Sequence, residues 1–159
     1  MREKTMSPKI IREESALTVT GRVKRPFMLP LSELCRMEAR EVKDLQIICG
    51  SGDPKGRIAH CRGVFLEDVI RRAEVITEED NDTKRMFVVV TAGDGYKVVF
   101  SWQEIFNSPI GDGVILLIEK NGIPLRGGHD RLDLVSSEDY FTGSRYVKGV
   151  EKIEIALAA

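Results

Sequence analysis

The chain has 159 residues, the size of one domain with a single buried core. Hydrophobic residues make up 42% and charged residues 31%, a balance typical of a soluble globular protein. The 24 basic residues are scattered and are offset by 25 acidic ones, which argues against a nucleic-acid partner. No apolar run approaches a signal-peptide core or a membrane span, and three cysteines without CxxC spacing argue against a disulfide framework. These features predict a cytoplasmic protein that has no membrane partner.

The first half of the chain predicts strands separated by turns and two helices. Residues 1–16 are charged and aperiodic, so we expect a flexible N-terminal arm followed by one domain over residues 17–159. Alternating or apolar runs predict strands over 17–23, 44–49 and 58–64, with a turn-rich stretch over 50–56. Helical spacing of apolar residues predicts helices over 32–40, with Ser32 as the N-cap, and over 66–73.

The second half continues the pattern with short strands and one more short helix. Residues 77–84 form a solvated loop, and the apolar run over 86–91 predicts a central strand. Further strands are expected over 97–100, 114–119, 132–135 and 150–157, and a short helix over 102–106. Asn121-Gly122 is a strong hairpin signal. The whole predicts an α+β domain built around a mixed β-sheet or a distorted β-barrel.

Cys49 closes an apolar run and leads directly into the turn Gly50-Ser51-Gly52-Asp53. A thiol at the junction between a strand and a glycine-rich turn is well placed to be a ligand or a catalytic group. The alternative is a small apolar residue that ends the strand, because free cysteine is among the most buried residue types. The local pattern leaves both interpretations open.

Two other groups of residues have the chemistry of a site. Cys49, His60, Cys61 and His129 are zinc-ligand types, but neighbours in a strand point to opposite faces, so His60 and Cys61 do not readily share one ion. The segments 126–131 and 142–149 combine glycines with arginines, a composition suited to binding an anion, although solvated loops share it. Walker, Rossmann, GxSxG and HExxH motifs are absent from the sequence.

The order of several short motifs carries more information than any one of them. Cys49-Gly50-Ser51-Gly52 is followed by Arg62-Gly63-Val64-Phe65-Leu66-Glu67-Asp68, Asp94-Gly95-Tyr96, Leu116-Leu117, Asn121-Gly122-Ile123-Pro124-Leu125, His129 and Gly143-Ser144-Arg145-Tyr146-Val147-Lys148. This order resembles the oxidoreductase molybdopterin-binding domain of the sulfite oxidase family. The resemblance runs from about Leu17 to Ile155 and implies the fold of that domain.

The resemblance also implies a cofactor, a reaction and a set of site residues. The cysteine at the position of Cys49 supplies its thiolate to the molybdenum of a molybdenum–molybdopterin cofactor. The expected cofactor contacts are Thr91, His129, Arg131, Gly143, Ser144, Arg145 and Lys148. The implied activity is two-electron oxygen-atom transfer on a small oxyanion or sulfoxide-type substrate, with a separate protein as the electron-transfer partner.

The sequence departs from the family pattern at one position that bears on the cofactor. Asp133 stands where the family has an arginine that contacts the cofactor, and a carboxylate there repels a phosphate unless Arg131 takes over that role. The alternative function is therefore a cofactor-free binding or regulatory module on the same fold, as a homo-oligomer in one version of that hypothesis.

Overall fold

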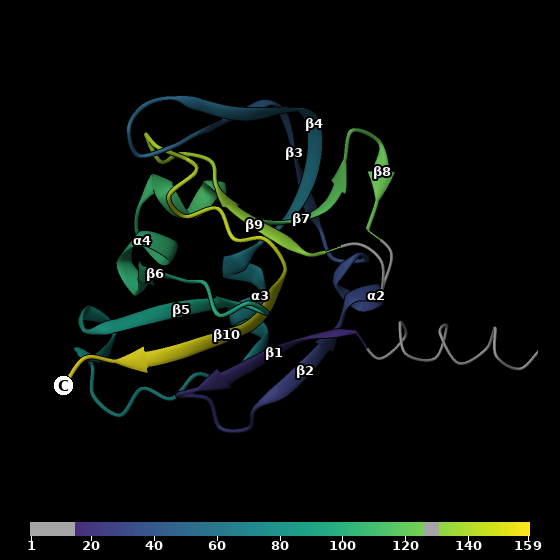
Figure 1. Cartoon of the computed structure of the whole chain (residues 1–159). Coiled ribbons are helices and arrows are strands. Elements are labelled where there is room, and N and C mark those ends of the chain that lie inside the picture. Colours follow the sequence, from purple (N-terminus) through teal and green to yellow (C-terminus); the bar gives the residue numbers. More distant parts are fainter. Residues whose placement is uncertain (1–14, 126–130) are drawn as a thin grey trace, which may run out of the picture.

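The computed structural model describes residues 15–125 and 131–159 and contains two five-stranded sheets (Figure 1). The first sheet has the order β2-β1-β10-β5-β6, and the second has the order β3-β4-β7-β8 with β9 also paired to β7. The strands are β1 (Ala16–Gly21), β2 (Phe27–Pro30), β3 (Ala39–Ile48), β4 (Pro54–Phe65), β5 (Met86–Ala92), β6 (Lys97–Ser101), β7 (Val114–Lys120), β8 (Ile123–Pro124), β9 (Asp133–Ser136) and β10 (Val150–Leu157).

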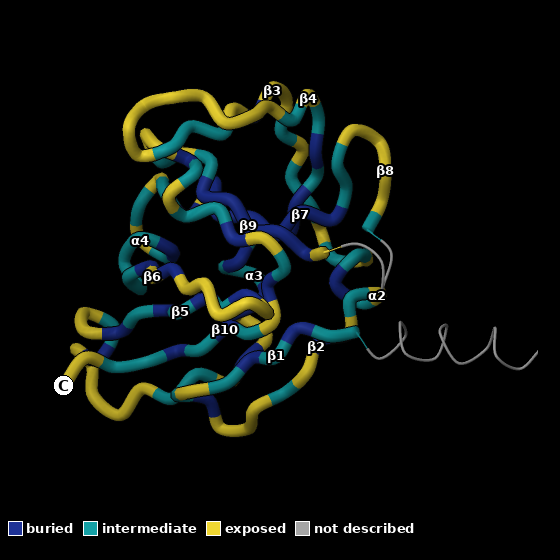
Figure 2. The backbone as a smooth tube through the Cα atoms, in the orientation of Figure 1, coloured by how far each residue is buried: buried dark blue, intermediate teal, exposed yellow. Residues whose placement is uncertain are grey.

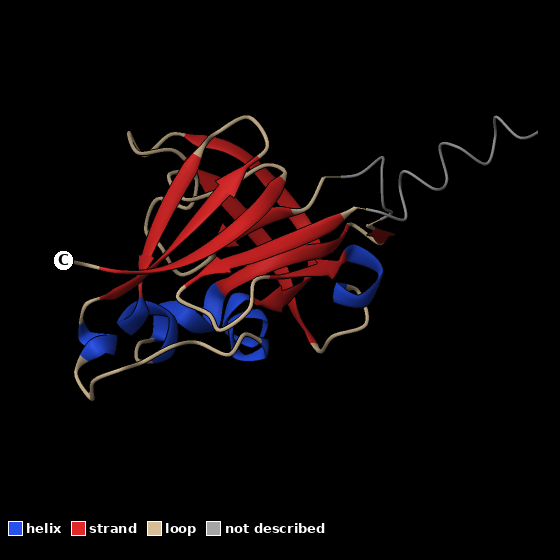
Figure 3. Cartoon of the chain, turned by 90° about the horizontal axis from the view of Figure 1, so that it is seen from below, coloured by secondary structure: helices blue, strands red, loops and turns tan. Residues whose placement is uncertain are grey.

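The helices are few and short, as an α+β domain of this size allows. They are α2 (Leu31–Leu34), α3 (Leu66–Arg72) and α4 (Trp102–Phe106), with 3₁₀ turns η2 (Asp82–Lys84) and η3 (Pro109–Gly113). Figure 3 shows the helices gathered along one side of the strands. No helix in the described part of the chain has both the length and the apolar character that crossing a membrane requires.

The sheets confirm the predicted α+β class and show that, over the described residues, it is built on open sheets rather than on a distorted barrel. The pairing of β1 with β10 is parallel, while the other named strand pairs are antiparallel, so the first sheet is mixed. Within residues 15–125 and 131–159, neither sheet closes on itself, so the architecture is two packed sheets rather than a barrel. The N-terminal arm lies almost wholly outside the described residues.

One predicted helix is wrong over most of its length. The helix expected over 32–40 ends at Leu34, and Ala39 already pairs with Val64 in the β3–β4 hairpin. Helical spacing of two apolar residues is a weak signal, and the long pairing of β3 with β4 overrides it. β4 also begins earlier than expected, at Pro54, which shortens the turn to residues 49–53.

Residues from both sheets form the main hydrophobic core. Its largest fully buried side chains include Leu17, Leu66, Phe100, Leu116 and Ile153. A second, smaller core lies on the other face of the second sheet and contains Leu45, Cys61, Ile115, Leu117 and Val135. β7 and β9 therefore run as a buried stripe through the molecule, whereas the β3–β4 turn is exposed (Figure 2).

Candidate functional site

A cavity of about 850 Å³ lies where the β3–β4 turn meets the chain between β9 and β10. Its walls come from β3, β4, the β5–β6 turn, the end of β7 and residues 143–148. Five basic side chains line it, namely Lys55, Arg57, Lys120, Arg131 and Lys148, against the two acidic side chains Asp94 and Asp133. The volume suits a small ligand and the charge excess suits an anionic one.

Cys49 lies at the edge of this cavity, directly after β3. Its backbone N–H donates to the Asp53 carbonyl (2.9 Å), and the Gly52 N–H donates to the Cys49 carbonyl (2.8 Å). Gly52 has a φ of 93°, a conformation that favours glycine, so the turn can be this tight. Cys49 is half-buried, whereas Cys61 is fully buried in the second core, so of the two thiols Cys49 is the more accessible.

The turn around Cys49 stabilises its thiolate. The Cys49 Sγ atom lies 2.8 Å from the Ser51 hydroxyl oxygen, which also lies 3.2 Å from an Asp53 carboxylate oxygen. The single hydroxyl proton stabilises the thiolate when Ser51 donates it to Sγ rather than to Asp53. Hydrogen bonds from the Ser51 side chain and backbone lower the pKa of Cys49 to about 7, with smaller contributions from the Asp53 N–H and Lys55. A substantial fraction of the side chain is therefore thiolate near neutral pH, the form that ligates metals.

Gly143 and Ser144 form the wall beside Cys49. The Gly143 N–H donates to the Ile48 carbonyl (2.7 Å), and a Cβ atom on Gly143 would lie 2.9 Å from that oxygen and 3.3 Å from the Cys49 Cα. Only glycine allows this close approach of two backbones. The Ser144 carbonyl accepts a hydrogen bond from the Tyr96 hydroxyl (2.8 Å), which ties the wall to the β5–β6 turn.

Asp133 lies at the buried end of the cavity, where its charge is compensated. Its side chain accepts hydrogen bonds from the Tyr146 hydroxyl (2.8 Å), the Gly149 N–H (3.1 Å) and Lys120 Nζ. Burial and the neighbouring Asp133 raise the pKa of Tyr146, so the phenol stays protonated and remains a donor. The departure at Asp133 therefore adds an ion pair to the cavity and leaves its net charge positive.

A β-bulge explains why Lys120 reaches this ion pair. The register of β4 against β7 shifts between Arg62 and Gly63, so Ile118 on β7 is the extra residue. The bulge places Lys120 opposite Cys61, on the face of the second core. Strict alternation along β7 predicts the other face for Lys120, so its role could not be predicted from the local pattern.

The structure brings together most of the residues predicted for the site. Cys49, Arg131, Gly143, Ser144 and Lys148 all line the cavity. Sequence reasoning missed the basic residues Lys55, Arg57 and Lys120 and the phenols Tyr96 and Tyr146. Of these, Tyr96 and Tyr146 stand within quoted motifs, Asp94-Gly95-Tyr96 and residues 143–148, whereas the three basic residues carry no such signal.

Two further predicted residues, Thr91 and Arg145, do not line the cavity. Thr91 is near the end of β5, where its hydroxyl accepts a hydrogen bond from Lys97 (3.4 Å), and it does not line the cavity. The Arg145 guanidinium contacts Glu104 and Asp139 instead of the cavity. His129 lies outside the described residues.

The zinc interpretation gains no support from the described residues. His60 Nε2 lies 2.9 Å from a Glu41 carboxylate oxygen on the exposed face of the β3–β4 hairpin, while Cys61 points into the second core. Within residues 15–125 and 131–159, no three histidine, cysteine, aspartate or glutamate side chains are grouped so that they could hold a metal ion.

The two-sheet fold thus carries a cavity with an excess of basic side chains and a cysteine at its edge. The sequence model of the oxidoreductase molybdopterin binding domain matches residues 4–157, and the chain belongs to that family. The resemblance drawn from the motif order is thereby confirmed.

Comparison with solved structures adds a likeness in fold. The sulfane dehydrogenase SoxCD from Paracoccus pantotrophus matches with a TM-score of 0.67 at 15% identity, over 91% of this chain and 39% of that one. This likeness shows a shared fold, and the present chain spans about two-fifths of the length of its neighbour. No curated protein matches the chain.

Proposed function

We propose that this domain binds a molybdenum–molybdopterin cofactor in the cavity and acts as an oxidoreductase with Cys49 as a metal ligand. The observation that carries the proposal is the thiol of Cys49, stabilised as thiolate by Ser51 at the edge of a positively charged cavity, in a family of molybdopterin-binding domains. Thiolate is a soft ligand, and the glycines around it leave room for a bulky cofactor.

The lining of the cavity fits the cofactor. Its volume of about 850 Å³ lies within the range of small-molecule and cofactor sites. Arg131 and Lys148 are the proposed partners of the cofactor phosphate, and Lys55 adds positive charge on the β4 side. Arg57 forms an ion pair with Asp44. Lys120 is paired with Asp133, so we assign it to the ion pair and not to the phosphate. His129 remains a proposed contact from the family resemblance alone.

The residues of the chain would hold and orient the cofactor and the substrate. When bound, the cofactor would supply two-electron redox chemistry coupled to oxygen-atom transfer. The excess of basic groups favours a small oxyanion or another polar acceptor such as a sulfoxide. A separate electron-transfer protein would complete the cycle.

Elemental analysis tests the proposal most directly. We would purify the protein from a host that makes the cofactor, measure molybdenum, tungsten and zinc, and record pterin fluorescence after oxidative release. Near-stoichiometric molybdenum with pterin is the expected result. A protein free of both would contradict the proposal and favour the cofactor-free binding module.

A pair of cysteine variants tests the ligand itself. Cys49→Ser is expected to abolish molybdenum retention, because a hydroxyl is a much poorer ligand for a soft metal site. Cys35→Ser is the matched control, since Cys35 is a half-buried thiol at the end of α2 and does not line the cavity. Equal metal content in the two variants would exclude Cys49 as the ligand.

A further inference from the structure

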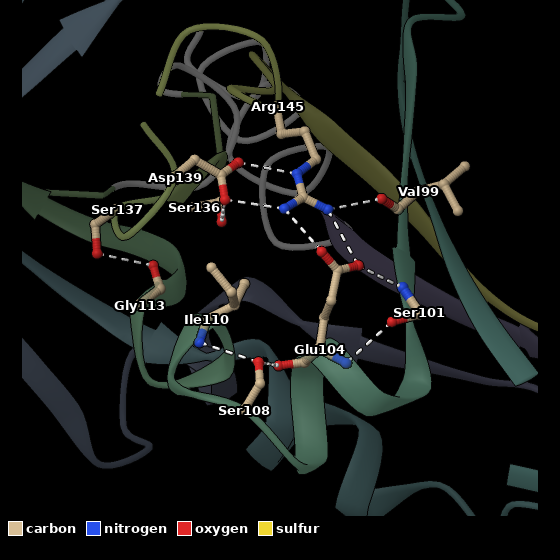
Figure 4. Close-up of polar contacts among 10 residues, drawn as sticks. All are labelled: Val99, Ser101, Glu104, Ser108, Ile110, Gly113, Ser136, Ser137, Asp139 and Arg145. Carbon is tan, nitrogen blue, oxygen red and sulfur yellow. Dashed lines mark hydrogen bonds and ion pairs between the residues drawn. The ribbon is translucent and has the colours of Figure 1, made fainter. Parts of the chain in front are cut away.

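The guanidinium of Arg145 has a partner for every N–H donor (Figure 4). Nε and Nη2 donate to the two oxygens of Asp139, both at 2.9 Å. Nη1 and Nη2 donate to the two oxygens of Glu104 at 3.3 and 3.1 Å, and Nη1 also donates to the Val99 carbonyl (3.0 Å). The guanidinium carbon lies 4.2 Å from the centre of the Phe100 ring. These contacts leave no donor for a further anion.

Both carboxylates around Arg145 are themselves fixed. Glu104 belongs to a capping box on α4: it accepts from the Ser101 N–H (2.8 Å) and donates its own N–H to the Ser101 hydroxyl (3.0 Å). Asp139 accepts from the Ser136 hydroxyl at the end of β9 (2.9 Å). Bidentate pairs between an arginine and carboxylates are among the strongest hydrogen bonds in proteins. Arg145 is therefore held in one orientation.

Arg145 connects the wall of the cavity to the first sheet. Gly143 and Ser144 line the cavity, and Arg145 follows them directly in the chain. On one side of this segment, the Thr142 hydroxyl and the Gly143 N–H bond to the end of β3, next to Cys49. On the other side, Arg145 reaches α4 and β6 through Glu104 and Val99. The wall beside Cys49 is thus anchored at both ends.

We infer that Arg145 is a positioning residue, which acts through Glu104 and Asp139 to hold the Gly143–Ser144 wall against the Cys49 turn and does not itself bind the cofactor. This inference rests on the proposed function for its relevance to the cofactor, although the contacts that carry it belong to the chain alone. The same residue was expected from the sequence to be a cofactor contact, so the two roles must be separated by experiment.

The two roles differ in what the partners of Arg145 do. A residue that bound the phosphate directly would tolerate Glu104→Gln and Asp139→Asn, because these changes release its donors. If Arg145 is a positioning residue, loss of its guanidinium and loss of the carboxylates of Glu104 and Asp139 should loosen the wall in the same way. Arg145→Lys adds a second distinction, since lysine can serve a phosphate as a point charge but cannot make bidentate pairs with two carboxylates.

Hydrogen exchange of the cofactor-free protein is the first readout. Backbone exchange over residues 142–146 is expected to rise about tenfold or more in Arg145→Lys, Arg145→Gln and the Glu104→Gln/Asp139→Asn double variant, through loss of charge-assisted hydrogen bonds. Exchange in β1 and β10 should stay unchanged. Arg71→Gln is the matched control, because Arg71 also pairs with a glutamate, Glu67, and lies over an aromatic ring, but on α3 away from the cavity.

Molybdenum retention in the loaded protein is the second readout. It should fall severalfold in the double variant as well as in both Arg145 variants, and stay at the wild-type level in Arg71→Gln. Wild-type exchange over 142–146 in Arg145→Lys would overturn the inference, and so would full retention in the double variant. A wild-type protein without molybdenum would instead contradict the proposed function, and the exchange data would still decide whether Arg145 holds the wall.

Discussion

The two faces of the second sheet contribute to different cores, and the side chains of β7 alternate between them. Val114, Leu116 and Ile118 point into the large core shared with the first sheet, while Ile115 and Leu117 point into the small core. The small core ends at the cavity, where the same face carries charged groups in place of apolar ones. Stability therefore depends mainly on one face of the sheet, which leaves the other free to hold a charged site.

Truncation of adjacent leucines on β7 tests this comparison with the largest expected effect. Leu116→Ala should lower the free energy of unfolding by about 2–5 kcal/mol, because a cavity in a densely packed core cannot collapse. Leu117→Ala should cost less, since the small core adjoins open space and can relax or admit water. Urea unfolding of both variants measures the order, and a larger loss for Leu117→Ala would contradict the comparison.

The strands were predictable because local patterns specify them. The apolar runs over 86–91 and 114–119 and the alternation over 17–23 correspond to β5, β7 and β1. Asn121 and Gly122 adopt φ values of 51° and 82°, the left-handed conformations of the hairpin turn expected there. The helix predicted over 32–40 was wrong because the pairing of Ala39 with Val64 is a long-range contact that the local sequence does not indicate.

The candidate site was predictable where a motif marks it and unpredictable where distant residues meet. Cys49 and Gly143 stand in recognisable motifs, and both line the cavity. The fixation of Arg145 depends on Glu104, which lies 41 residues away in the chain. Lys120 reaches Asp133 through a bulge that no local pattern announces. Charge compensation is thus a property of the fold that single motifs do not encode.

Removal of the charge of Asp133 tests the cavity side of the comparison. Asp133→Asn should destabilise the fold by about 1–3 kcal/mol, because Tyr146, Gly149 and Lys120 lose a charged acceptor in a buried position. The same change raises the positive charge of the cavity, so it should tighten binding of pyrophosphate, a probe for the cofactor phosphate. Urea unfolding and calorimetric titration give the two values. Weaker pyrophosphate binding would show that the carboxylate helps to organise the anion site.

Serine substitutions at Cys61 and Cys49 compare a thiol in the small core with a thiol in the turn beside the cavity, and the expected change in stability is smaller. Cys61 is 0% exposed in the small core, so Cys61→Ser should cost about 1–2 kcal/mol for a hydroxyl that is buried without a strong partner. Cys49→Ser should change stability by less than about 0.5 kcal/mol, because the side chain lies in a turn and a serine can keep the contact with Ser51. Thermal melts of the two variants measure this difference. Equal losses would mean that the turn at Cys49 is packed as tightly as the core.

The smallest expected effect is the dependence of stability on pH that comes from the contact between Arg145 and Glu104. Burial alone raises the pKa of Glu104, but hydrogen bonds from Arg145 and Ser101 outweigh it, so the pKa in the folded protein lies below its ordinary value. A carboxyl with a lowered folded pKa stabilises the protein fully above its unfolded pKa, roughly 4.3, and loses that contribution as the pH falls through the folded value.

Glu104→Gln should therefore lower stability at pH 7 and matter progressively less towards pH 3. Since the side chain of Glu104 is about a third exposed, solvent screening limits the difference to about 1 kcal/mol or less. Urea unfolding of wild type and variant at pH 7, 5 and 3 measures the convergence. A constant difference across this range would mean that the carboxylate charge contributes nothing and that geometry alone holds Arg145, because glutamine keeps an acceptor oxygen at every pH.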